Sequence, residues 1–154
     1  MKKYRLKVSL LGRPRLYRVI ETSENATLEN LHDAIFDAFG RYDPHLYSFF
    51  LTRKDTKSVH SIYQAPEFTH PRNTEDFMGF GQPKRSAAKT RIGDLDLAAK
   101  DVFHYLFDFG DDWWHRIRVE SVAAVPGQGK YVNLVKSVGE APDQYPDYDE
   151  DDDD

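Results

Sequence analysis

The chain has 154 residues, of which 40% are hydrophobic and 14% aromatic, and this length fits one domain that can bury a core. It has no cysteine, which excludes structural disulfides, thiolate metal sites and a catalytic cysteine. The formal net charge is -5, but residues 143–154 carry eight acids and no base, which leaves about +3 on residues 1–142. We therefore expect one domain over residues 1–142, followed by an acidic tail over residues 143–154 that is solvated and at least partly disordered.

The basic start of the chain does not have the pattern of a targeting segment. In residues 1–15 apolar side chains alternate with charged ones, whereas a signal peptide needs a continuous apolar region. No run of the sequence approaches the length of a membrane span. We expect a cytoplasmic protein that does not interact with a membrane.

Alternating apolar side chains predict a hairpin at the start of the domain. Residues 4–10 alternate apolar and polar side chains, as a half-buried strand does. A turn at Gly12 and Pro14 leads into residues 15–21, which have the composition of a second strand.

A single helix and a third strand follow the hairpin. Thr27 has the side chain of an N-cap, apolar residues then recur at helical spacing, and Gly40 supplies the stop. Residues 45–51 alternate again as a strand. Residues 53–89 are rich in Pro, Gly, Ser, Thr and charge, and because so long a structureless loop is uncommon, we expect a short helix or strand within it.

The most informative segment is FHYLFDFGDDWWHRIRVE, at residues 103–120. It predicts two strands joined by an acidic turn, with aromatic side chains at alternating positions. One more strand is expected over residues 131–138. The fold class we predict is α+β: a single domain with a β-grasp-like mixed sheet, an N-terminal hairpin, one main helix packed on the sheet, and a C-terminal aromatic hairpin.

Carboxylates and histidines near the aromatic hairpin are the candidates for chemistry, because together they can bind a divalent metal or transfer protons. The candidate polar cluster comprises His32, His45, Asp108, Asp111 and His115. The alternative is structural, with short carboxylates capping the N–H groups of the turn. No metal-site spacing such as H-E-x-x-H is present, so we assign no catalytic residue, metal ligand or cofactor.

These motifs resemble a known family. Its members share an L-H helix, an H-L-Y-x-F strand and a Y-x-F-D-F-G-D-x-W-x-H hairpin, and this chain has Leu31-His32, HLYSF at residues 45–49 and YLFDFGDDWWH at residues 105–115. The chain resembles the plasmid pRiA4b ORF-3-like family, some of whose members carry a transposon label. The resemblance covers roughly residues 4–142 and implies an α+β domain of uncharacterised function associated with mobile elements.

The leading functional hypothesis is a non-enzymatic binding or adaptor module for a protein partner. Aromatic and arginine side chains anchor such surfaces, and the candidate binding surface comprises Arg18, Trp114, Arg116 and Arg118, provided that they face outward. A nucleic acid is the weaker candidate partner, because +3 is a small charge for phosphate binding. The alternative is a metal-dependent hydrolase or nuclease, which requires the polar cluster to converge in an open cleft.

Overall fold

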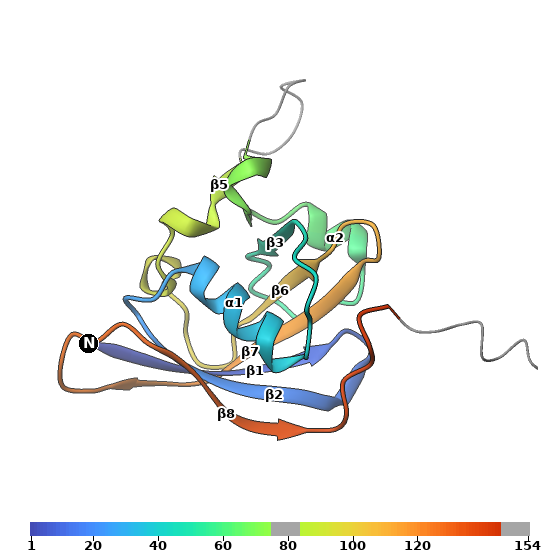
Figure 1. The fold of residues 1–154 in the computed structure, drawn as a ribbon. Coiled ribbons are helices and arrows are strands. Elements are labelled where there is room, and N and C mark those ends of the chain that lie inside the picture. Colours follow the sequence, from blue (N-terminus) through green and yellow to red (C-terminus); the bar gives the residue numbers. More distant parts are fainter. Residues whose placement is uncertain (75–83, 146–154) are drawn as a thin grey trace, which may run out of the picture.

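The computed structural model describes residues 1–74 and 84–145, and it forms one mixed α+β domain (Figure 1). Eight strands make a single sheet in the order β5-β4-β3-β6-β7-β1-β2-β8, in which the β4–β5 pair is parallel and the other pairs are antiparallel. The strands are β1 (Lys2–Leu10), β2 (Arg13–Ser23), β3 (Tyr47–Phe50), β4 (Glu67–Thr69), β5 (Lys84–Ser86), β6 (Val102–Phe107), β7 (Trp113–Ala124) and β8 (Val132–Val138). The predicted fold class, including both hairpins, is confirmed.

The main helix is α1 (Leu28–Ala38), and it begins where the sequence predicts. The Thr27 hydroxyl accepts a hydrogen bond from the N–H of Asn30 (3.1 Å), and the Asn30 side chain accepts one from the N–H of Thr27 (3.0 Å). This capping box satisfies two backbone donors of the first turn. The shorter helices are α2 (Val59–Tyr63) and the 3₁₀ turns η1 (Pro71–Asn73), η2 (Ala87–Lys89) and η3 (Ile92–Leu95).

The core lies between α1 and one face of the sheet. Leu31 and Ile35 of α1 are buried against the rings that β6 presents on that face, Phe103, Tyr105 and Phe107. All six residues of β6 are buried, because this strand lies in the middle of the sheet and is covered on both sides. Large rings therefore supply much of the apolar contact that holds α1 in place.

The segment over residues 53–89, where the sequence predicts a hidden element, contains α2, β4 and β5 within its described part. Helix α2 packs on the face of the sheet opposite α1, where Ile62 contacts Phe50 and Leu106. It covers only the β3–β6–β7 part of that face. Figure 1 shows no described helix on the corresponding side of β1, β2 and β8, which stays open.

Residues 144 and 145, which the sequence assigns to the acidic tail, pack against the segment that follows α1. The side-chain Oε1 of Gln144 accepts hydrogen bonds from the N–H groups of Tyr42 (2.9 Å) and Asp43 (3.1 Å), and its Nε2 donates to the backbone carbonyl of Asp43 (2.8 Å). Gln144 is 1% exposed. The contacts of the domain thus extend to Tyr145, and the rest of the predicted tail, residues 146–154, lies outside the described residues.

Candidate functional site

The acidic turn of the aromatic hairpin is held by its own carboxylate. Asp108 has a left-handed backbone (φ +64°), and its Oδ1 accepts hydrogen bonds from the N–H groups of Gly110 (3.0 Å) and Asp111 (3.3 Å). A short carboxylate that bonds the backbone two and three residues on is the usual device of such turns. Asp108 therefore has the structural role that was the alternative to chemistry.

His45 is the one histidine of the predicted cluster that meets Asp108. Its Nε2 lies 3.4 Å from Oδ2 of Asp108 and 3.5 Å from Oδ2 of Asp43. The same nitrogen is 2.6 Å from the hydroxyl of Tyr145, which donates to Asp43 (2.7 Å). These four side chains form a polar group at the surface that ties residues 43–45 to the end of the described chain.

His32 lies inside the protein, away from that group. Its ring stacks on Tyr47 with 3.7 Å between centroids, and its Nδ1 is 2.5 Å from the hydroxyl of Tyr105. Burial lowers the pKa of His32 to about 3 and raises the pKa of Tyr105, so the imidazole is neutral and the phenol is protonated. The neutral imidazole and the protonated phenol share a hydrogen bond, and this bond joins α1 to β6.

His115 is fully buried, between the rings of Phe39 (5.1 Å between centroids) and Tyr105 (5.0 Å). Burial, with the nearby Arg41 guanidinium, lowers its pKa to about 3. Asp111 is exposed in the turn. The predicted cluster therefore divides between the surface and the core, and the described residues contain no group of three or more His, Asp or Glu side chains arranged to hold a metal ion.

Arg18, a member of the predicted binding surface, does not face outward. It is 6% exposed, its Nε donates to the carbonyl of Ala38 (2.9 Å), and its Nη1 donates to the carbonyls of Val138 and Gly139 (3.1 Å each). It thus connects β2 to the ends of α1 and β8. The alternation of side chains along β2 indicates that Arg18 faces inward, because Arg18 lies on the same face of the strand as Leu16 and Ile20, which are both buried.

The other three members of that surface share the sheet face away from α1. Trp114 packs against Phe50 (5.7 Å between centroids) and Tyr63 of α2 (5.4 Å). Arg116 forms a two-pronged ion pair with Asp55, at 2.8 and 3.0 Å. Arg118 is half-buried opposite Lys7 of β1. Only Arg118 of the four is left without such a fixed partner in the described chain.

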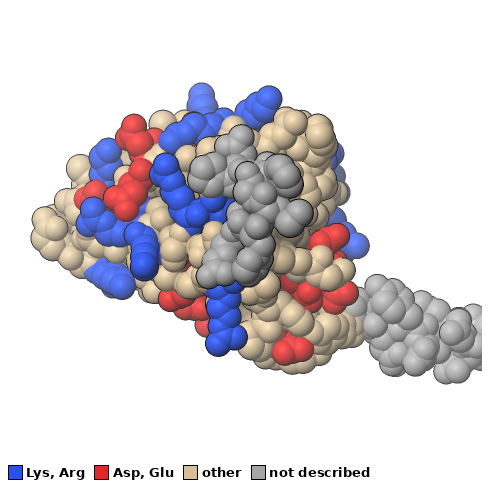
Figure 2. Space-filling view, turned by 90° about the horizontal axis from the view of Figure 1, so that it is seen from above, with Lys and Arg blue, Asp and Glu red and all other residues tan. Residues whose placement is uncertain are grey.

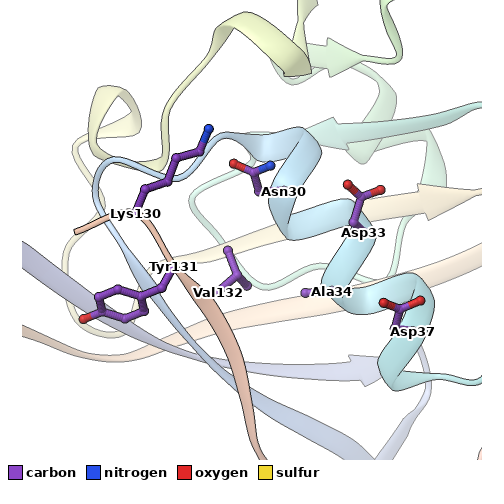
Figure 3. Close-up of a pocket in the computed structure, with 7 residues that line it drawn as sticks. All are labelled: Asn30, Asp33, Ala34, Asp37, Lys130, Tyr131 and Val132. Atoms are coloured by element: carbon purple, nitrogen blue, oxygen red, sulfur yellow. The ribbon is translucent and has the colours of Figure 1, made fainter.

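A groove that the sequence did not indicate lies between α1 and the beginning of β8 (Figure 3). Its volume is about 370 Å³. Figure 3 shows acidic and amide side chains along the helix, with the side chain of Val132 pointing toward the helix from the facing strand. The groove is lined by Asn30, Asp33, Ala34, Asp37, Lys130, Tyr131 and Val132.

Charge in this groove is mainly negative. Burial, with Glu29 and Asp37 nearby, raises the pKa of Asp33. A carboxylate whose charged form is disfavoured by its neighbours is stabilised by an approaching cation. The helix side of the groove is therefore suited to a basic ligand.

The strand side of the groove is a sheet edge, because β8 ends the strand order and, among residues 1–74 and 84–145, pairs with β2 alone. The Ser23 N–H donates to the Tyr131 carbonyl (3.0 Å), and Val132 stands opposite Thr22. In an antiparallel pair alternate residues direct their N–H and C=O groups toward and away from the partner strand. Val132 therefore directs its backbone groups outward, beside the groove.

Comparison with known protein families identifies the family of this chain. The profile of the plasmid pRiA4b ORF-3-like proteins matches residues 2–145. The chain belongs to the plasmid pRiA4b ORF-3-like family. The predicted resemblance is confirmed, and it extends over nearly the whole sequence.

A solved relative of this pRiA4b ORF-3-like chain shares the fold. It is the crystal structure of a protein of unknown function, MM3350 from Methanosarcina mazei Go1, which is 25% identical, with a TM-score of 0.67 over 93% of this chain and 72% of that one. No curated protein matches the chain. In the described residues of the structure, no helix has the length and apolarity to cross a membrane.

Three buried histidines, His32, His104 and His115, make the stability of the protein depend on pH, because burial lowers the pKa of each. The unfolded chain takes up protons on His32 and His115 below about pH 6.5, whereas the folded chain resists protonation down to about pH 3. The free energy of unfolding should therefore be highest above pH 6.5 and fall on acidification, by up to about 1.4 kcal/mol per pH unit for each histidine. Urea denaturation between pH 7.5 and pH 4.5 measures this slope.

The variant His115→Leu should reduce the slope by up to about 1.4 kcal/mol per pH unit, because it removes one of the three buried histidines and replaces it with a side chain of similar volume that does not titrate. His60→Asn serves as the matched control, since His60 is exposed on α2. An unchanged slope in His115→Leu would contradict the assignment of a neutral buried imidazole.

The buried position of Arg18 predicts a structural cost on its removal. Arg18→Met should lower the free energy of unfolding by about 2 to 4 kcal/mol, because four carbonyls lose a charged donor, those of Tyr17, Ala38, Val138 and Gly139. Arg15→Met, three residues earlier and exposed, should change it by less than about 0.5 kcal/mol. Equal urea midpoints for the two variants would show that Arg18 does not connect these elements.

Proposed function

We propose that this protein is a non-enzymatic binding module that takes up an extended, Lys- or Arg-bearing segment of a protein partner as an added strand on β8. The observation that carries the proposal is the position of a free sheet edge next to the acidic groove beside α1. Domains that bind peptides by strand addition use this combination, in which the edge supplies backbone hydrogen bonds and the adjacent groove selects side chains.

The edge of β8 is accessible for such pairing. Leu134 and Val135 are 48% and 44% exposed, which is unusual for aliphatic side chains in the middle of a strand. Leu134 pairs with Ile20, a core residue, so it lies on the same face as α1 and continues the apolar floor that Val132 begins. An added strand would cover these side chains and bond the outward backbone groups of Val132.

The acids of α1 select the charge of the partner. Asp33 and Asp37 are exposed and one helical turn apart, so both carboxylates line the same side of the groove. A cationic side chain of the added strand would relieve their mutual repulsion. An acidic segment would increase it, so the charge discriminates between partners.

A bulge limits how long the added strand can be. The register between β2 and β8 shifts so that Ile20 faces Leu134 while Val19 faces Lys136, which leaves Val135 as an extra residue. Bulges and edge lysines are devices that keep an exposed edge from pairing at random. The regular part of the edge is therefore short, near Val132 to Leu134, and suits a segment of about three or four residues.

An amide-detected NMR titration tests the proposal with the acetylated, amidated hexapeptide TKVKVT. We expect shift changes that centre on Val132, Leu134, Asp33 and Asp37, and no comparable changes with the peptide TEVEVT. The variant Val132→Pro removes one outward N–H without touching the bonds to β2. This variant should weaken binding of the basic peptide TKVKVT by about tenfold or more, equivalent to about 1.4 kcal/mol.

A double substitution tests the contribution of the acidic side chains of the groove. The double variant Asp33→Asn, Asp37→Asn should weaken binding of TKVKVT several-fold at low salt. The loss of affinity should be smaller at high salt, as expected for exposed charges. Asp111→Asn makes the same kind of change in the distant turn and serves as the control. Shift changes that lie away from β8 and α1, or equal binding of both peptides, would refute the proposed site.

A further inference from the structure

A row of basic side chains crosses the open face of the sheet, the face that α1 does not cover. The register places Arg118 of β7 directly opposite Lys7 of β1, and Lys7 opposite Val19 of β2, which in turn faces Lys136 of β8. Neighbouring strands are about 4.8 Å apart, so three cations lie in one line across four strands. Arg15 extends the same face, since it alternates in step with Tyr17 and Val19 along β2.

The acids on this face are already paired with other cations. Glu21 lies 3.2 Å from Lys3, Glu120 lies 3.4 Å from Arg5, and Asp55 binds Arg116. No carboxylate in residues 1–74 and 84–145 lies within 4.0 Å of the charged groups of the four remaining cations, which are Lys7, Arg15, Arg118 and Lys136.

Like charges directly opposite each other destabilise a sheet. Lys7 and Arg118 stand in this arrangement on the central strands, where an acid on either strand would have been favourable. The repulsion is relieved when an anion binds between them. The row is therefore unfavourable for the free protein and favourable for a complex with a polyanion.

The open face also carries an aromatic side chain, Tyr17. Tyr17 is partly exposed in the next row of the sheet, and the Lys7 ammonium lies 4.2 Å from the centre of its ring. A cation–π contact at an exposed site is weak. A base can take the place of the ammonium on the ring while Lys7 moves to a phosphate.

We propose that this open face binds single-stranded nucleic acid, with Lys7, Arg15, Arg118 and Lys136 on the phosphates and Tyr17 against a base. Basic side chains combined with an aromatic ring on an open surface are the usual elements of single-strand recognition. A membrane surface would require protruding apolar side chains, whereas Val19 between the cations is 2% exposed.

Fluorescence anisotropy with the full chain and fluorescein-labelled 20-mers of dT and rU tests this proposal. Four phosphate contacts predict a slope of about -2.8 in log K against log salt, so that affinity falls about 50-fold between 50 and 200 mM salt. In the triple variant Lys7→Gln, Arg118→Gln, Lys136→Gln the slope should shrink to about -0.7, a fall of about 3-fold over the same range.

Tyr17→Ala should weaken binding by about tenfold with the slope unchanged, because it removes a stacking contact and no charge. The matched control removes three cations from the opposite side of the molecule by Arg72→Gln, Arg85→Gln and Lys89→Gln. Figure 2 shows the molecule from above the view of Figure 1, with Lys and Arg side chains over the left and upper parts of the view. This control should keep the slope of the unmodified chain.

The proposal would be overturned by no binding of either oligonucleotide at 50 mM salt, or by loss of the slope in the control triple variant and not in the open-face triple variant. Binding to anionic vesicles without binding to the 20-mers would assign the face to a membrane and also overturn it. The groove variant Asp33→Asn with Asp37→Asn should leave oligonucleotide affinity unreduced, so failure of the peptide proposal and failure of this one are distinguishable.

Discussion

The structure depends on the burial of the rings of β3, β6 and β7 beneath α1. The hydrogen bond between His32 and Tyr105 fixes the register of the helix on those rings, because each side chain needs a polar partner in the interior and each is the partner of the other. The neutral state of His32 follows from the same burial. With α1 held in place, its outer side, which carries Asp33 and Asp37, comes to stand over the beginning of β8.

Local patterns predicted much of this fold, because they depend on residues close in sequence. The N-terminal hairpin, the capped helix after Thr27 and the aromatic hairpin each have a period or a turn that the chain itself displays. The third strand was expected from residue 45 and begins at Tyr47, because His45 bonds Asp108 and Tyr145 outside the sheet. Boundaries of this kind are set by contacts between distant segments, which no local pattern contains.

The candidate site was less predictable for the same reason. Sequence spacing could not show that His32 and His115 point into the core while His45 stays at the surface, since that division follows from which face each strand and helix buries. Nor could it show that β8 is an edge strand, because strand order is a property of the whole sheet. Arg18 is different: its alternation with Leu16 and Ile20 marked it as inward, and only its charge suggested otherwise.

The sheet separates two surfaces of opposite charge. The groove on the α1 side presents Asp33 and Asp37, whereas the open face presents the row from Arg118 through Lys7 to Lys136. Strand side chains alternate between faces, and the bulge at Val135 reverses this alternation within β8, so Val132 and Leu134 lie on one surface and Lys136 on the other. The charge of the groove disfavours a polyanion and the charge of the open face disfavours a basic segment, so each of the two proposed ligands is suited to one surface. The twofold period of the strands, together with the bulge in β8, thus lets one small sheet present two surfaces of opposite charge on its two faces.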